Sequence, residues 1–534
     1  MSSVSRLSGA LVVALAVAAL LGGFSGIASA ATVQHVPQDY PTIQAAIDAA
    51  ASGDTVLVAA GTYAEHMDFH AKQITVESAS GADATIIDGG GTGVVVTINA
   101  NAGETPVLRG FTVRNGGAGF PDGGIDTSGG PALIENNTIT ANRFCDDGAI
   151  SAAFSDATIR NNLISGNSQA CSGGVGGAGV SIRGAGTVQV LKNIITGNTH
   201  TSAAGGVGLF AAGTPTISGN VIKDNVGWQG GGISMFNVSD ATITNNIIVG
   251  NQAAQGAGIY WLVPSGARGP LVVNNTIAAN QANSGIAVFA DGFDAQASLV
   301  NNILVGDGSG SVLDCGGFND PNPPIIRFND VRNGGTGPAY GGICSDQTGV
   351  NGNISGDPLF VDATAGNFHI RIGSPAVDAG SNTGAPATDI DGDPRPLDGN
   401  GDGVAVVDMG ADEILPSGDT TPPTITCSAS PNVLWPPNHE LRAVTVAISA
   451  NDDSGTVTVT LLSVKSSQAD SGLDPQDAPN DIQGWVIGTD DRTGLLRTER
   501  FEQARTYTLT YQAADPTGNT ATCQATVTVP LNQR

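Results

Sequence analysis

Apolar and polar positions repeat roughly every 27 residues through the first two thirds of the chain. In each repeat, aliphatic residues at alternate positions, such as Ala157 and Ile159, precede an asparagine, and another aliphatic residue follows two positions later. Alternation of this kind predicts two short strands that meet at a bend. A supersecondary unit repeated at this interval predicts a solenoid. The bend positions are Gly110, Asn137, Asn162, Asn193, Asn220, Asn246, Asn275, Asn302 and Asn329.

A second asparagine and a glycine-rich stretch complete most repeats. Five residues after the bend lie Asn115, Asn142, Asn167, Asn198, Asn225, Asn251 and Asn280. Farther on, two or three small residues run into Ile or Val, as in Gly205 to Val207 and Gly231 to Ile233. Two strands at the bend and a third after the glycine-rich stretch predict three strands per coil. Stacked coils lie about 4.8 Å apart, so asparagines at one corner can hydrogen-bond along the stack.

The start of the repeat region resembles a known superfamily. Residues 41–50 predict a short amphipathic helix that covers the end of the solenoid. Tyr40-Pro41-Thr42-Ile43-Gln44, Gly53-Asp54-Thr55-Val56, and Gly61-Thr62-Tyr63 with Glu65 resemble the entrance of the pectin-lyase-like superfamily. The resemblance implies an all-β fold, a right-handed parallel β-helix over residues 31–375, with an extended ligand in a groove along one face. The superfamily includes lyases, hydrolases, esterases, epimerases and adhesins, so the fold leaves the activity open.

Two further segments follow the solenoid. Residues 376–418 predict an acidic closing segment and linker, similar to the segment that ends many bacterial secreted β-helix proteins. Residues 419–534 alternate Val and Thr, for example over 443–448 and 522–529, which predicts a small β-sandwich. This module resembles the immunoglobulin-like (Ig-like) modules of bacterial extracellular proteins.

The first 30 residues and the cysteines indicate an extracellular protein. Arg6, the apolar run from Leu11 to Leu21 and Ala28-Ser29-Ala30 predict a signal peptide over residues 1–30, with a signal anchor as the alternative. No later segment predicts a membrane span. Six cysteines fit an oxidising compartment. Their phases in the repeats predict the pairs Cys145 with Cys171 and Cys315 with Cys344, and Cys427 would pair with Cys523.

The acidic composition of the chain argues against polyanionic partners. The chain has 21 Lys and Arg against 48 Asp and Glu, a formal net charge of −27. Such a surface repels polyanions, so we expect no nucleic-acid partner.

The stretch after the second turn of each coil carries the candidate binding residues. Planar rings stack on sugar faces, and amides or carboxylates hydrogen-bond sugar hydroxyls, so this stretch predicts a glycan-binding groove. The alternative is ordinary polar decoration of loops. The candidates are Gln169, Trp228, Gln229, Gln252, Tyr260 and Trp261.

Candidate catalytic residues lie in the same stretch. Arg143, Asp146, Asp147 and His200 offer a base and carboxylates for β-elimination on a uronate. The signatures of known enzymes are absent, because no histidine lies between glycines and no Arg-x-Pro-x-x-Arg occurs. A structural role for these side chains is the alternative.

A calcium site is predicted in the acidic segment. Asp389, Asp391 and Asp393, followed by Asp398, Asn400 and Asp402, alternate oxygen ligands as a calcium loop does. The second run departs from the EF-hand pattern because its twelfth position is Met409. A simple cluster of acidic turns is the alternative.

The sequence thus favours a secreted or cell-surface β-helix protein that binds extracellular polysaccharide or a cell-surface glycan, or acts as an adhesin. A polysaccharide lyase acting on uronate-containing glycan is the main alternative, and a structural surface spacer is the second.

Overall fold

The computed structural model describes residues 31–119, 122–306, 308, 310–415, 421–452, 457–470, 479–515 and 518–532. The predicted signal peptide lies outside the described residues. The rest is all-β apart from one short α-helix and one 3₁₀ turn.

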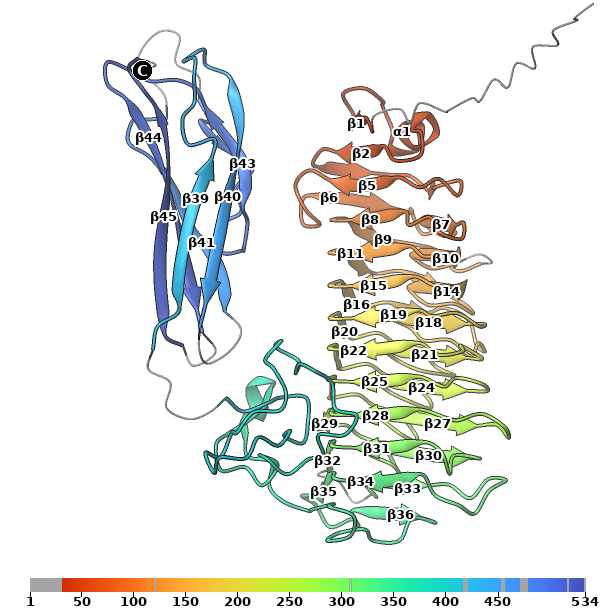
Figure 1. Ribbon diagram of the computed structural model, residues 1–534. Helices are drawn as coiled ribbons and strands as arrows, with labels where there is room; N and C mark the ends of the chain where they lie inside the picture. Colours follow the sequence, from red (N-terminus) through yellow and green to blue (C-terminus); the bar gives the residue numbers. More distant parts are fainter. Residues whose placement is uncertain are drawn as a thin grey trace, which may run out of the picture.

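Three long parallel sheets form the solenoid predicted from the repeats (Figure 1). Sheet A has twelve strands in stack order: β1 (Val33–Val36), β2 (Thr55–Val58), β5 (Thr75–Ser78), β8 (Val107–Arg109), β11 (Leu133–Glu135), β15 (Thr158–Arg160), β19 (Gln189–Leu191), β22 (Thr216–Ser218), β25 (Thr242–Thr244), β28 (Leu271–Val273), β31 (Ser298–Val300) and β34 (Ile325–Arg327).

Sheet B follows sheet A within each coil and has eleven strands: β3 (Gly61–Tyr63), β6 (Thr85–Asp88), β9 (Thr112–Arg114), β12 (Thr138–Thr140), β16 (Leu163–Ser165), β20 (Ile194–Thr196), β23 (Val221–Lys223), β26 (Ile247–Val249), β29 (Thr276–Ala278), β32 (Ile303–Gly306) and β35 (Asp330–Asn333).

Sheet C completes the coil, also with eleven strands: β4 (Met67–Asp68), β7 (Val96–Ala100), β10 (Ile125–Gly129), β14 (Ile150–Ser155), β18 (Val180–Arg183), β21 (Val207–Phe210), β24 (Ile233–Phe236), β27 (Ile259–Val263), β30 (Val288–Gly292), β33 (Leu313–Cys315) and β36 (Tyr340–Gly342).

Buried asparagines join the coils at the corner between sheets A and B. The Asn193 backbone N–H and its Nδ2 both donate to Oδ1 of Asn220 on the next coil, at 2.9 and 3.0 Å. The same Nδ2 donates to the Ile159 carbonyl of the preceding coil at 2.8 Å. The residue before the ladder asparagine turns through a left-handed conformation, as Lys192 does with φ 54°. The hydrogen-bonded ladder predicted from the sequence is confirmed.

The second asparagine of each repeat forms a parallel ladder where sheet B ends. Asn198 donates from its backbone N–H and Nδ2 to Oδ1 of Asn225, at 3.0 Å each. Asn225 makes the same pair of bonds to Asn251. Two ladders therefore fix the register at both ends of the sheet B strands β12, β16, β20, β23, β26 and β29.

The core is a column of aliphatic side chains inside the coils, covered at its first end by a helix. Ile43 and Ile47 of α1 (Ile43–Ala49) are fully buried in that column. Thr42 caps α1 by accepting from the Ala45 N–H, and the Glu65 carboxylate accepts from the N–H groups of Ile43 and Gln44. Figure 1 shows α1 at one end of the stack and β36 at the other.

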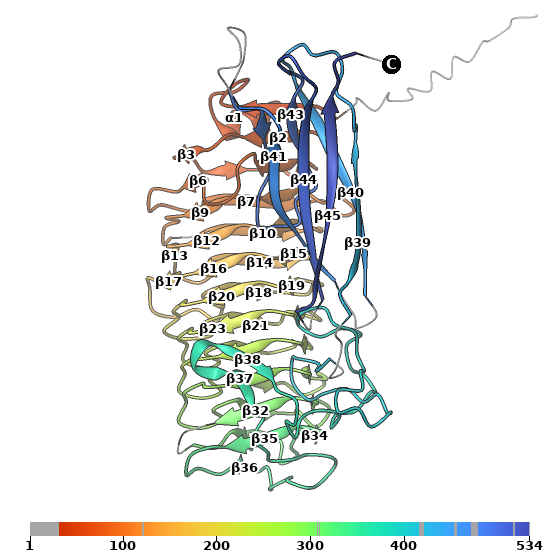
Figure 2. The same cartoon turned by 90° about the vertical axis from the view of Figure 1, so that its left-hand side faces the viewer.

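Residues 357–415, here the flanking segment, pack on the side of the stack. The segment contains β37 (Phe360–Asp362), the 3₁₀ turn η1 (Ala363–Ala365) and β38 (Asn367–Ile370). Phe368 and Ala411 pack on the outward side chains Ile247 and Val249 of sheet B. The sequence suggested that this region closes the solenoid, but apolar residues on the outer face of β26 and β32 bring it to the side (Figure 2).

The C-terminal module consists of two antiparallel sheets, compatible with the predicted small β-sandwich. One sheet contains β39 (Thr424–Ser430), β40 (Leu441–Asn451), β43 (Thr493–Arg497) and β42 (Ile482–Gln483). The other contains β41 (Thr458–Ser466), β44 (Arg505–Ala514) and β45 (Thr520–Val529).

All three predicted disulfides are present. Cys145 with Cys171 and Cys315 with Cys344 link neighbouring coils, with Cα atoms 4.8 and 5.3 Å apart. Cys427 with Cys523 links the two sheets of the C-terminal module. Pairing between coils at nearly the same phase follows directly from the repeat register.

Asn220→Ala tests the ladder. The substitution leaves the buried backbone N–H and Nδ2 of Asn193 without their acceptor and the Val190 carbonyl without its donor. Unsatisfied buried groups cost about 1–3 kcal/mol each, so we expect a loss of at least about 3 kcal/mol in urea unfolding. The exposed Asn99→Ala is the control and should change stability by less than about 0.5 kcal/mol. An equal effect of both variants would contradict the ladder's role.

Asp294 gives stability a pH dependence. Its buried carboxylate accepts from Trp261 Nε1 at 2.9 Å, and burial raises the pKa of Asp294 to about 7. Since the folded pKa exceeds the unfolded value, its stabilisation is greatest at low pH and is lost as pH rises through about 7. Asp294→Asn should therefore gain about 1–3 kcal/mol relative to wild type between pH 5 and pH 8. Thermal unfolding across that range measures the gain, and the exposed Asp83→Asn should show none.

Candidate functional site

A fourth row of parallel pairings follows the loops from sheet B to sheet C. β13 (Arg143–Phe144) pairs with β17 (Ser168–Gln169), and single bridges continue the row through Thr199, Val226, Gln252 and Gln281. Side chains at the first position of the row point outward, whereas Phe144 and His200 at the second position are buried. The loops therefore stack in register. Their outward side chains form what we call the loop strip: Arg143, Thr199, Val226, Trp228, Gln252, Gln281 and Asn283.

An open depression lies in the middle of the loop strip. It has a volume of about 400 Å³ and is lined by Val226, Gly227, Gln252, Ala253, Gln281, Ala282 and Asn283. Trp228 follows Gly227 directly and is 59% exposed, an unusual position for so large an apolar ring. Its backbone is fixed, because its N–H donates to Ala203 and its carbonyl accepts from Ala254. An exposed ring on a fixed backbone thus follows directly after the residues that line the depression.

Two other predicted binding residues occupy different positions in the loops. Gln229 lies one step farther along and contacts Gln255 of the next coil, with Nε2 and Oε1 3.4 Å apart. The Gln169 amide is hydrogen-bonded to backbone groups of neighbouring loops. Its Nε2 donates to the Cys145 carbonyl at 3.0 Å, and its Oε1 accepts from the Thr201 N–H.

Tyr260 and Trp261 do not line the groove that the sequence suggested. Trp261 is fully buried in the solenoid core, because strand alternation turns it inward. Tyr260 points outward from β27 but is only 4% exposed. Its ring lies beside those of Phe236 and Phe289, at centroid distances of 5.4 and 5.6 Å. Neither ring offers a face to a ligand.

Carboxyl groups gather near β10, β14 and β18 of sheet C, on earlier coils than the depression. Arg183 Nη1 lies 3.4 Å from Asp147 Oδ1, and Asp122 Oδ2 accepts from the Cys145 N–H at 2.5 Å. Burial, reinforced by mutual repulsion, raises the pKa of Asp126 and Asp147 above the usual range, and burial also raises that of Asp122. We call Asp122, Asp126, Asp147 and Arg183 the acidic cluster.

The acidic cluster includes one of the four predicted catalytic residues. Asp147 belongs to it, and Arg143 lies on the loop strip. Asp146 lies beside the cluster, with its backbone carbonyl accepting from Arg183. His200 is 1% exposed, and its Nδ1 accepts from the N–H groups of Ser202 and Ala203. Burial lowers the pKa of His200 to about 4, so the ring is neutral and serves as a turn cap.

Sequence reasoning placed Arg183 near Asp147 in coil order but missed Asp122 and Asp126, although one signal was present. Asp122-Gly123-Gly124-Ile125 and Asp147-Gly148-Ala149-Ile150 have the same pattern, and Ile125 pairs with Ile150 in the sheet. The first aspartates of the two runs therefore have equivalent phases on adjacent coils.

Most predicted calcium ligands cap their own turns. Asp389 Oδ1 accepts from the N–H groups of Asp391, Gly392 and Asp393. Asp398 accepts from those of Gly401, Asp402 and Gly403. Asn400 and Asp402 also accept from backbone N–H groups two residues ahead. Calcium binding at these turns stays a prediction. Two of the predicted ligands also contact another segment, since Asp391 pairs with His369 and Asp389 Oδ2 accepts from the Glu413 N–H.

Comparison with known proteins identifies the repeat region. The family model described as a right-handed beta helix region matches residues 70–304 and again residues 201–354, which together cover more than half of the chain. No curated protein matches the chain. Among the described helices, none has the length and apolar character needed to cross a bilayer.

Proposed function

The chain belongs to the right-handed β-helix family, and from this premise we propose that it is a secreted or cell-surface protein that binds extracellular polysaccharide along the loop strip. The exposed ring of Trp228 beside stacked amide side chains carries this proposal. The refinement to pectin-lyase-like and Ig-like parts rests on the sequence resemblance alone.

The chemistry of the loop strip suits sugars. An aromatic ring removes the apolar face of a pyranose from water, and the amides of Gln252, Gln281 and Asn283 both donate to and accept from hydroxyls. The coil step of about 4.8 Å is comparable with the length of one sugar ring, so each coil presents its side chains to a successive unit. An extended glycan running along the stack is the ligand this geometry favours.

Charge and disulfides support the same proposal. The seven residues of the loop strip include one arginine and no carboxylate, in a chain of net charge −27. The strip can therefore hold a neutral glycan, or an anionic one near Arg143. Three disulfides favour an oxidising, extracellular compartment, as the predicted signal peptide does.

A carbohydrate-active enzyme, a polysaccharide lyase in particular, is the second candidate function. The acidic cluster favours it, because adjacent carboxyls of raised pKa beside a cation can divide the roles of acid and base. The resemblance of the entrance residues to the pectin-lyase-like superfamily adds to this candidate. Calcium would supply the charge needed to acidify a uronate.

Trp228→Ala should weaken polysaccharide binding. We expect at least about a tenfold loss of affinity in affinity electrophoresis against neutral and uronate glycans, since exposed aromatic anchors carry much of a binding free energy. The double variant Gln252→Ala, Gln281→Ala should weaken binding as well. Phe318→Ala, which truncates a ring 58% exposed on a different loop, is the matched control. Wild-type binding that survives both loop-strip changes would contradict the proposal.

Incubation of the wild type with uronate glycans and calcium tests the second candidate. A lyase releases unsaturated products that absorb in the ultraviolet, and Asp126→Asn and Asp147→Asn should each reduce that rate at least about 100-fold. Asp156→Asn is the control and should retain the wild-type rate. Asp156 is exposed, and its side chain accepts a hydrogen bond from the Thr187 N–H. Absence of product in the wild type would reject the lyase, and absence of both product and binding would support a structural spacer.

A further inference from the structure

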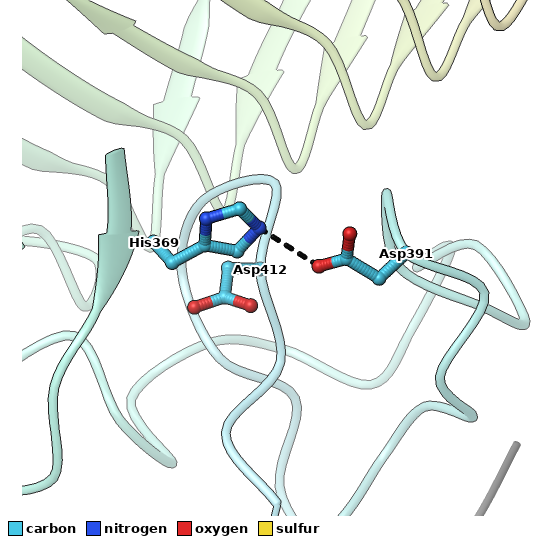
Figure 3. Close-up of side chains that lie close together, drawn as sticks. All are labelled: His369, Asp391 and Asp412. Atoms are coloured by element: carbon cyan, nitrogen blue, oxygen red, sulfur yellow. Dashed lines mark hydrogen bonds and ion pairs between the residues drawn. The ribbon is translucent and has the colours of Figure 1, made fainter. Parts of the chain in front are cut away.

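Three side chains from separate parts of the flanking segment converge at a cavity of about 400 Å³. His369 extends from β38, Asp391 from the turn at residues 389–393, and Asp412 from the following stretch (Figure 3). Thr458 and Asp515 of the C-terminal module line the same cavity. The site therefore lies where the flanking segment meets the C-terminal module, away from the loop strip.

The ligand atoms are spaced for one ion. One atom from each of His369, Asp391 and Asp412 lies within 4.8 Å of the others, and among the described residues no other set of three His, Cys, Asp or Glu does this. Zinc binds imidazole nitrogen and carboxylate oxygen at about 2.0–2.2 Å. Each ligand atom thus needs to move by less than about an ångström to surround a single ion.

The histidine is oriented as metal-binding histidines are. Nδ1 of His369 donates to Oδ1 of Asn367 at 2.6 Å, and the His369 N–H donates to the same oxygen. This bond places a proton on Nδ1 and directs Nε2 toward Asp391, which lies 2.8 Å away. A hydrogen bond from the second ring nitrogen is the usual means by which proteins fix the tautomer of a metal ligand.

The two carboxylates are positioned in different ways. Asp412 is 8% exposed, and its Oδ2 accepts from the Ile370 N–H at 2.8 Å. Asp389 fixes the turn that carries Asp391, and its second oxygen accepts from the Glu413 N–H. A backbone group therefore sets the Asp412 carboxylate relative to β38, whereas the Asp391 carboxylate is placed by its capped turn and by its bond to His369.

The cavity also has an excess of negative charge. Five acidic residues line it, with His369 as the one basic residue of the lining. Arg395 offsets Glu413 from outside the lining, with Nε and Oε2 3.6 Å apart. Partly desolvated carboxylates repel one another, and a divalent cation is the common means of neutralising such a site.

We propose that His369, Asp391 and Asp412 bind one divalent transition-metal ion, with Zn²⁺ preferred to Ca²⁺. The preference follows from the ligands, because zinc accepts imidazole nitrogen with carboxylate oxygens at low coordination number, whereas calcium requires six to eight oxygens. Three protein ligands leave a position for water. The site differs from the predicted calcium loops, of which it uses only Asp391.

Isothermal titration of the full chain after EDTA treatment and dialysis tests the proposal. We expect one equivalent of Zn²⁺ per chain, with Ca²⁺ neither matching nor displacing it. His369→Gln and Asp391→Asn should each weaken zinc binding at least about 100-fold, and Asn367→Ala about 10- to 100-fold, because it frees the ring tautomer. Circular dichroism of each variant checks that the fold is retained.

His70→Gln is the matched control. His70 also lies between two aspartates, with Nε2 3.2 Å from Asp48 and Nδ1 3.4 Å from Asp68, but its two nitrogens face different carboxylates. Its loss should leave the zinc isotherm unchanged. Absence of zinc binding, unchanged binding by His369→Gln, or calcium binding that zinc cannot displace would overturn the proposal. Each result is independent of glycan binding, because no glycan is added.

Discussion

The hydrogen bonds between buried asparagines of successive coils are the interaction on which the other features depend. A solenoid corner exposes backbone groups to an apolar interior, where unpaired donors and acceptors are costly. Each ladder asparagine satisfies such groups on the preceding coil, as Asn220 does for the Asn193 N–H and the Val190 carbonyl. Its own N–H donates in turn to Asn246 of the next coil. The same bonds allow only one register. Coil lengths can then vary in the loops without shifting the strands.

Fixed register makes separate residues into columns. Arg143, Val226 and Gln252 lie far apart in sequence but belong to one row of pairings, so their side chains stand on one surface. The acidic cluster arises in the same way, since Asp122 and Asp147 hold equivalent phases of adjacent coils. Residues that repeat at one phase of the coils therefore determine which groups the loop strip and the acidic cluster present. An extended ligand matches such a linear arrangement.

The features that follow from local periodicity could be predicted from the sequence. The asparagine ladders and the two disulfides between coils were accessible because each depends on one phase of the repeat. The burial of Tyr260 was not, because it depends on how the rings of Phe236 and Phe289 pack around it on the outer face of sheet C. The convergence of His369, Asp391 and Asp412 was also inaccessible, since the flanking segment has no repeat to fix which of its turns meet. Sequence phase therefore predicts the solenoid and the row of loops, whereas contacts between nonrepeating segments require the structure.

The central claim is that polysaccharide lies along the loop strip, and hydrogen exchange of the backbone with and without saturating glycan tests it most directly. The account predicts slower exchange in residues 226–232, 252–258 and 281–285, with sheet A and the C-terminal module unchanged. Protection confined to the C-terminal module, or to sheet A, would contradict it.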